Sequence, residues 1–342
     1  MKIATAILSS VLLLAQSFQN GLCQTGIKHF IFFSLDRENI HDSAFYSNPG
    51  VSGAQVTYPW KRLEPQKDQY DFSEIEEDMN FLNSKGKKLF IQLQDVTFDS
   101  ARYPVPKYIL TDSAYHGGAD PQYYFYDDDE NKAEKAGWVS RRWDPAVAER
   151  FHKLLTALGQ KFNGKIEGIN LQETAVAFGE NGKLFPQGFT YENYRDAIKE
   201  NMKVLKQVFP NSVAIMYANF MYEHGESKSN LKDLYNYAKE IKMGMGGPDI
   251  KVYRKYQMEN SYPLIRDLHG IAPTGVAVQH GNYDVINPKT GKQVTVPEIL
   301  DFAESYLRLN YIFWCTQEPY YSKQVLPLLK SKKLYHEKNK FH

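Results

Sequence analysis

A glutamate at the end of a predicted strand is the residue of this chain best placed for chemistry. Residues 165–171 form a short apolar run that predicts a buried strand, and Gln172 and Glu173 follow where the strand should open into a loop. In a (β/α)8 barrel the carboxyl ends of the strands form the active-site face. A carboxylate there can give and take a proton during catalysis. Glu173 is therefore the first candidate catalytic residue. The alternative, a loop carboxylate that caps the turn through Thr174, stays open.

The elements that must position Glu173 recur along the chain as apolar, strand-like runs followed by helical patterns, as in parallel βαβ units. The strand-like runs are residues 29–35, 53–58, 88–93, 165–171, 212–217, 242–247, 275–279 and 310–314. Helical patterns cover residues 72–84, 145–162, 191–208, 231–241 and 297–309. This alternation predicts an α/β fold, a (β/α)8 TIM barrel. An open doubly wound sheet fits less well, because no glycine-rich phosphate turn follows the first run.

One long segment interrupts the alternation. Residues 95–142 show little periodic structure, and such a stretch in a compact domain is usually functional or disordered. Its aromatic content argues against disorder: Tyr103, Tyr108, Tyr115, Tyr123, Tyr124, Phe125, Tyr126 and Trp138. Because the segment follows the third strand, we expect it to lie over the barrel mouth. Its acidic run, residues 127–130, is predicted to be solvated, since it lacks a calcium-loop pattern.

Composition narrows the classes of function. The chain has 342 residues and a formal net charge of +1, so it lacks the basic surface typical of nucleic-acid binding. Its 24 Tyr, 20 Phe and 4 Trp favour a carbohydrate partner, although protein cores use the same residues. No HExxH motif, Cys/His cluster or GxSxG motif is present, so we expect no metal, no cofactor and no serine or cysteine nucleophile. The sequence leaves the oligomeric state open.

The N-terminus has the pattern of a secretory signal peptide. Lys2 precedes an apolar stretch, residues 3–15, that is too short to span a bilayer, and small and polar residues follow up to Cys23. We predict a signal peptide over residues 1–23 and a single barrel domain over residues 24–342. The protein would be periplasmic or secreted, with no membrane attachment after signal removal. Cys23 and Cys315 are the only cysteines, so no disulfide is expected in the mature chain.

Two motifs in the second predicted unit carry a family resemblance. They are residues 60–65 (WKRLEP) and 70–72 (YDF), and with the preceding strand they resemble the second βα unit of clan A glycoside hydrolases. These are (β/α)8 retaining enzymes that include β-galactosidases and cellulases. Residues 104–109 resemble the element after their third strand, and residues 311–314 resemble their eighth strand, whose Trp forms the floor of the sugar site.

The resemblance implies a general acid/base Glu at the end of strand four and a nucleophilic Glu at the end of strand seven. The first corresponds to Glu173, with Gln172 where an Asn commonly precedes it. At the second position this chain has Gln279, and glutamine cannot form a glycosyl-enzyme intermediate. Hydrolysis needs a second carboxyl group about 5 Å away for retention or roughly 6.5–9.5 Å away for inversion. The candidates for it, in order, are Glu318 and Asp249, then Asp284 and Asp95.

Further residues near the predicted strand ends are candidates for substrate contacts: Tyr58, Trp60, Arg62, Asp95, Gln172, Gln279, His280 and Trp314. Trp314 favours a stacking platform, because it closes the eighth strand. For Trp60, packing in the core is equally consistent. Arg62 could instead pair with Glu64, and His280 could be satisfied by backbone groups.

These observations predict an exported glycoside hydrolase that cleaves a poly- or oligosaccharide in an aromatic-lined cleft, with Glu173 as general acid/base. The alternative from another class is a carbohydrate-binding barrel that kept Glu173 and lost the nucleophile. Fold alone does not separate the two. A barrel of different chemistry, such as a lyase, has no positive signal in the sequence.

Overall fold

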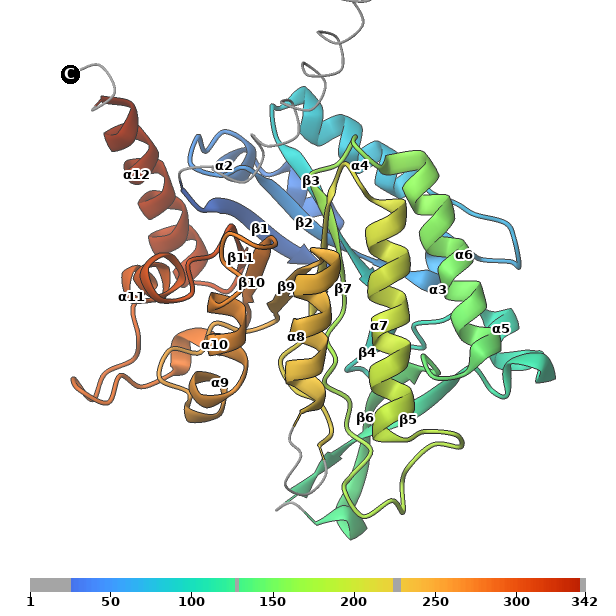
Figure 1. The fold of residues 1–342 in the computed structure, drawn as a ribbon. Coiled ribbons are helices and arrows are strands. Elements are labelled where there is room, and N and C mark those ends of the chain that lie inside the picture. Colours follow the sequence, from blue (N-terminus) through green and yellow to red (C-terminus); the bar gives the residue numbers. More distant parts are fainter. Residues whose placement is uncertain (1–25, 127–128, 224–228, 339–342) are drawn as a thin grey trace, which may run out of the picture.

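The computed structural model describes residues 26–126, 129–223 and 229–338. Eight parallel strands close into a barrel in the order β1-β11-β10-β9-β8-β7-β3-β2 (Figure 1). They are β1 Lys28–Ser34, β2 Gly53–Pro59, β3 Lys88–Gln94, β7 Gly168–Leu171, β8 Val213–Tyr217, β9 Gly244–Gly247, β10 Thr274–Val278 and β11 Tyr311–Cys315. Each coincides with one of the predicted runs, which confirms the (β/α)8 barrel.

Helices surround the barrel (Figure 1). The long ones are α4 Ser73–Ser84, α6 Pro145–Phe162, α7 Tyr191–Val208, α8 Asn230–Ile241 and α12 Leu326–Lys338. Short ones are η2 Arg37–His41, α2 Ser43–Tyr46, α3 Trp60–Leu63, α9 Lys255–Glu259, α10 Ser261–Arg266, η6 Asn282–Asp284 and α11 Val296–Asp301. Two further segments, η7 Phe302–Tyr306 and η8 Tyr321–Val325, are π-helical.

The two longest helices begin where the sequence provides a capping residue. The Asp144 side chain accepts hydrogen bonds from the backbone N–H groups of Ala146 and Val147 at the start of α6. At the start of α7, Thr190 accepts from the N–H group of Asn193. Such caps satisfy N–H groups that have no partner within the helix. Both helices therefore have the bounds that the hydrophobic pattern predicts.

The barrel interior is filled by alternate side chains of the strands. These inward residues form an apolar cluster of their own: Phe30, Phe90, Ile215, Tyr217, Ala277, Tyr311 and Phe313. A polar layer adjoins it, in which the Gln55 amide donates hydrogen bonds to Asn170 Oδ1 (2.8 Å) and to the Tyr217 hydroxyl (3.1 Å). The outward side chains pack in a second, larger cluster under the helices. The alternation decides which residues near a strand end can face the mouth.

The glycines of β9 allow a close approach of neighbouring backbone. A Cβ atom at Gly246 would lie 1.6 Å from the carbonyl oxygen of Gly275 on β10, so no other residue fits there without moving the strands. The sixth predicted run, residues 242–247, therefore has glycines where other strands have apolar side chains, and it still forms the barrel strand β9.

The segment after β3 is more ordered than the sequence predicts. It contains a three-stranded antiparallel sheet in the order β4-β6-β5. The elements are β4 Val96–Thr97, α5 Lys107–Thr111, η3 Ser113–Tyr115, β5 Ala119–Phe125, η5 Glu130–Lys132 and β6 Ala133–Ser140. The prediction of little periodic structure was wrong, because β6 has few apolar residues and the β5–β6 register shifts between Gln122 and Tyr123. Figure 1 shows the sheet at the end of the barrel where α6 and α7 begin, which is the carboxyl end of the strands.

The predicted signal peptide and Cys23 lie outside the described residues, whereas Cys315 is buried in β11. Within the ranges that the structure describes, we find no helix with the length and apolar character needed to cross a membrane.

Candidate active site

Three polar residues occupy equivalent positions on three neighbouring strands. Glu173, Asn219 and Asp249 each lie two residues beyond the last residue of β7, β8 and β9, respectively. These strands are adjacent and parallel in the barrel. Their carboxyl ends therefore bring the three side chains to the same sector of the mouth.

Glu173 is held from two sides. Its Oε2 accepts a hydrogen bond of 2.8 Å from the Asn219 amide. Its backbone carbonyl accepts one of 3.0 Å from the guanidinium of Arg142. The residue as a whole remains partly exposed at the carboxyl end of β7.

The surroundings raise the pKa of Glu173 from 4.5 to about 7. Burial is the largest cause, because it disfavours the charged carboxylate, and the negative charge of Asp249 acts in the same direction. The hydrogen bond from Asn219 and the positive charges of Arg142 and Lys251 oppose the shift. A carboxyl group with a pKa near neutrality can both donate and accept a proton.

Asp249 is anchored at the end of β9. Its Oδ1 accepts a hydrogen bond of 2.7 Å from the Asn282 amide, and Lys251 Nζ lies 3.6 Å from Oδ2. Its side chain is 22% exposed. Its negative charge is one of the causes of the raised pKa of Glu173.

The other candidate carboxylates make contacts of a different kind. Glu318 is exposed and accepts hydrogen bonds from the backbone N–H and hydroxyl of Ser322, as a cap at the start of η8. Asp95 is buried in an ion pair with Arg142 (2.7 Å) and accepts from the Ser140 hydroxyl. Asp284 is exposed and accepts a 3.3 Å hydrogen bond from Gln293. The sequence favours Glu318 ahead of Asp249 as the second carboxyl group. The contacts of Glu318 with Ser322 and the effect of the Asp249 charge on Glu173 favour the reverse order.

Gln172, Gln279 and His280 lie at the strand ends, as predicted. Gln172 Oε1 accepts a 3.0 Å hydrogen bond from the backbone N–H of Val96. The Gln172 residue is partly exposed, and its amide nitrogen takes no part in this hydrogen bond. Gln279 follows β10 and is partly exposed, and the strand alternation that points Ala277 inward also points Gln279 into the mouth. His280 is exposed beside it.

Two aromatic residues of β2 and its following turn do not face the mouth. The Tyr58 hydroxyl donates a 2.6 Å hydrogen bond to Asp78 on α4, outside the barrel. Trp60 is fully buried, donates a 2.8 Å hydrogen bond to Glu64 Oε2, and packs on Phe151 of α6 with ring centroids 5.1 Å apart. The prediction that they contact substrate was wrong, because the strand turns them toward the helix layer.

The contacts of Arg62 and the position of Trp314 also differ from those predicted. Arg62 forms an ion pair with Glu74 of α4 on the outer surface, while Glu64 pairs with Arg150. Trp314 is fully buried in the outer core, and its Nε1 lies 3.3 Å from His29 Nδ1. Since Phe313 points into the barrel, strand alternation points Trp314 out, and it cannot form a sugar platform.

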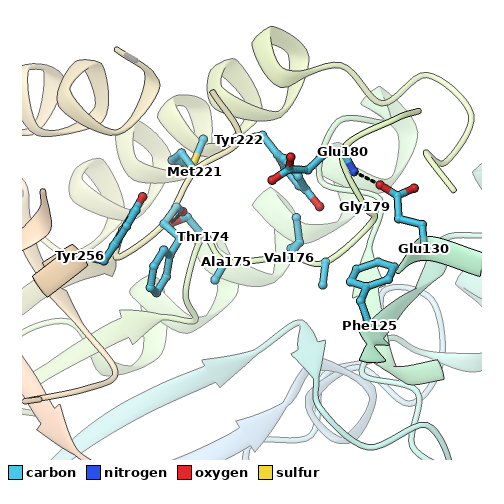
Figure 2. Close-up of a pocket in the computed structure, with 12 residues that line it drawn as sticks. Phe125, Glu130, Thr174, Ala175, Val176, Gly179, Glu180, Met221, Tyr222 and Tyr256 are labelled. Atoms are coloured by element: carbon cyan, nitrogen blue, oxygen red, sulfur yellow. Dashed lines mark hydrogen bonds between the residues drawn. The ribbon is translucent and has the colours of Figure 1, made fainter. Parts of the chain in front are cut away.

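A cavity of about 650 Å³ adjoins the site. It is lined by Phe125, Glu130, Thr174, Ala175, Val176, Ala177, Gly179, Glu180, Phe220, Met221, Tyr222 and Tyr256. Figure 2 shows residues 174–176 running between Tyr256 on one side and Phe125 and Glu130 on the other. Asn219, Phe220 and Tyr256 are not among the residues predicted from the sequence. The amide and aromatic residues that follow the fifth predicted strand were the signal that could have found the first two.

No protein-family profile and no curated protein sequence matches this chain. Solved structures do match it in fold. A β-galactosidase from the psychrophilic Marinomonas ef1 aligns over 91% of this chain and 60% of its own length, with a TM-score of 0.58 and 9% identity. The GH36 α-galactosidase AgaA from Geobacillus stearothermophilus, solved in complex with stachyose, aligns over 92% and 42%, with a TM-score of 0.51 and 10% identity.

A GH10 endoxylanase retrieved from a sugarcane soil metagenome aligns over 87% of this chain and 89% of its own, with a TM-score of 0.49 and 11% identity. The chain spans less than two thirds of the length of the two galactosidases. These matches show a (β/α)8 barrel that this chain shares in fold with the two galactosidases.

Proposed function

We propose that this protein is a glycoside hydrolase that cleaves a poly- or oligosaccharide, with Glu173 as general acid/base. The observation that carries the proposal is the position of Glu173. It is a partly exposed residue at the end of β7, its carboxyl group is held by Asn219 and has a pKa raised to about 7, and it lies beside an aromatic-lined cavity. A protonated Glu173 would protonate the glycosidic oxygen as the bond to the leaving sugar breaks.

Asp249 is proposed as the second carboxyl group. Gln279 stands where the family resemblance implies a nucleophile, and an amide cannot take that role. Asp249 is partly exposed, accepts a hydrogen bond from Asn282 and lies 3.6 Å from Lys251 Nζ. Glycoside hydrolysis requires a second carboxyl group besides the general acid.

The test is release of reducing ends from a panel of glycans by wild type, Glu173→Gln and Asp249→Asn. Glu318→Gln is the matched control, since Glu318 is a carboxylate on the surface. We expect activity in wild type and control and its loss in the two site variants. Equal activity in wild type and Glu173→Gln would remove Glu173 from the mechanism.

A second function, an inactive carbohydrate-binding barrel, is favoured by Gln279 alone. It would be established by glycan binding to the wild type with no release of reducing ends. Export is part of the proposal on the basis of the N-terminal pattern, and sequencing the N-terminus of the mature protein tests it.

A further inference from the structure

The cavity beside Glu173 is continuous in sequence with the site. Thr174 follows Glu173, Phe220 follows Asn219, and both Thr174 and Phe220 line the cavity. Residues 174–177 line the cavity, so a ligand bound there lies along the segment that directly follows Glu173; Figure 2 shows its first three residues. The volume of about 650 Å³ is in the range of small-molecule sites, which makes it large enough for more than a single ring.

One wall of the cavity offers an aromatic platform. Phe220 and Tyr256 stack with ring centroids 4.7 Å apart and planes 25° apart. Tyr256 lies in α9 and is 40% exposed. Its ring is supported by Phe220 and still presents surface to the cavity. Aromatic faces of this kind bind the apolar C–H faces of sugar rings.

The opposite wall is fixed by a carboxylate. Glu130, in η5 between β5 and β6, accepts hydrogen bonds from the backbone N–H groups of Glu180 (2.5 Å) and Asn181 (3.1 Å). Gly179 approaches so closely that an added Cβ would lie 2.5 Å from the Glu130 carboxyl carbon, and its φ of +77° also favours glycine. The insertion and the loop after β7 are thereby joined at the cavity edge (Figure 2).

The charge of the lining selects among glycans. Glu130 and Glu180 are the charged residues that line the cavity within the described part of the chain, and both are acidic. The negative charge of these walls repels uronic-acid or sulfated sugars, and the exposed Glu180 can accept hydrogen bonds from the hydroxyl groups of neutral ones.

We infer that this cavity binds the part of an uncharged oligosaccharide next to the scissile bond, with the stacked Tyr256 and Phe220 as its platform. The inference deepens the proposed function and rests on it for the place of the scissile bond. The substrate class is thus a neutral chain of several sugar units.

Binding is measured by isothermal titration calorimetry in a Glu173→Gln background, which prevents turnover. The probes are neutral tetrasaccharides of glucose, xylose, mannose or galactose, and tetragalacturonate as the anionic counterpart. We expect at least one neutral probe to bind and tetragalacturonate not to. Tyr256→Ala should raise the Kd of the neutral probe about tenfold.

Tyr306→Ala is the matched control, because Tyr306 forms a similar stacked pair with Phe302 (4.9 Å, 15°) outside this cavity. It should leave the Kd unchanged. The inference is overturned if no neutral probe binds, if tetragalacturonate binds more tightly, or if the two tyrosine variants have the same effect. Binding that depends on Tyr256 without hydrolysis by wild type supports the inference and refutes the catalytic proposal. If wild type hydrolyses a glycan but Tyr256→Ala leaves the Kd of the neutral probe unchanged, the catalytic proposal is supported and the inference about the cavity is refuted.

Discussion

The amide of Asn219 donates a 2.8 Å hydrogen bond to Oε2 of Glu173, and this contact joins the ends of two adjacent barrel strands. Leu171 of β7 pairs in register with Met216 of β8, so the residues just beyond both strands are brought side by side. The contact has two effects. It orients the carboxyl group, and it favours its ionised form against the burial that favours the protonated one.

Loss of this hydrogen bond should change the pH dependence of activity. With Glu173 as the acid, kcat/KM of the wild type is expected to fall as the pH rises through about 7. Asn219→Ala removes a donor that lowers the pKa, so the pKa rises and the alkaline limb moves up by about one pH unit. The pH profile of kcat/KM on a substrate from the glycan panel measures this. An unmoved limb would show that another group controls it.

Glu173 should also make stability depend on pH. Its pKa is about 7 in the folded protein, whereas a glutamate in the unfolded chain has the ordinary pKa of 4.5. The folded state therefore holds the proton more tightly, and its contribution to stability is full below pH 4.5 and is lost as the pH rises to 7. Glu173→Gln cannot ionise, so relative to wild type it should gain about 1–3 kcal/mol between pH 5 and pH 8.

Urea unfolding of wild type and Glu173→Gln at the two pH values gives this difference. The same experiment on Glu318→Gln is the control, since Glu318 is exposed. A stability difference between wild type and Glu173→Gln that does not change with pH would contradict the raised pKa.

Asp249→Asn is expected to lower kcat by at least about 100-fold, because it removes the second carboxyl group while keeping the hydrogen-bonding shape. It also removes a negative charge that raises the pKa of Glu173, so that pKa should fall. Glu318→Gln should keep kcat within about twofold of wild type, as a surface substitution should. Steady-state kinetics decide between the two carboxylates, and the reverse result would return the role to Glu318.

The motif at residues 60–65 is expected to act through stability. Glu64 is fully buried, accepts from Trp60 and pairs with the buried Arg150. Glu64→Ala leaves that guanidinium without its buried partner and should destabilise the fold by about 3–5 kcal/mol. Arg62→Ala, in contrast, removes an exposed ion pair and should cost about 0–1 kcal/mol.

Chemical denaturation measures both stability changes, with activity assayed on the folded variants. If Arg62→Ala were stable and yet lost glycan binding, Arg62 would contact substrate after all.

The barrel could be predicted from local patterns in the sequence. The eight apolar runs and the helices between them depend on local patterns that the tertiary structure preserves, and α6 and α7 even keep their predicted bounds. Sequence also identified Glu173, because a carboxylate directly after a buried strand is a local feature. The antiparallel sheet of residues 96–140 was missed, since its β6 strand carries few apolar residues and is stabilised by pairing with distant segments.

The residues that surround Glu173 could not be predicted without the three-dimensional arrangement of the strands. The direction of a side chain near a strand end depends on strand register, and a shift of one residue moves it to the other face. That is why Trp314 lies in the outer core although its neighbour Phe313 fills the barrel. The neighbours of Glu173 come from β8 and β9, far along the chain, and no local pattern relates Asn219 and Asp249 to it. Parallel pairing of β7 with β8 and of β8 with β9 makes these strands adjacent, and this pairing brings the residues of the candidate site together.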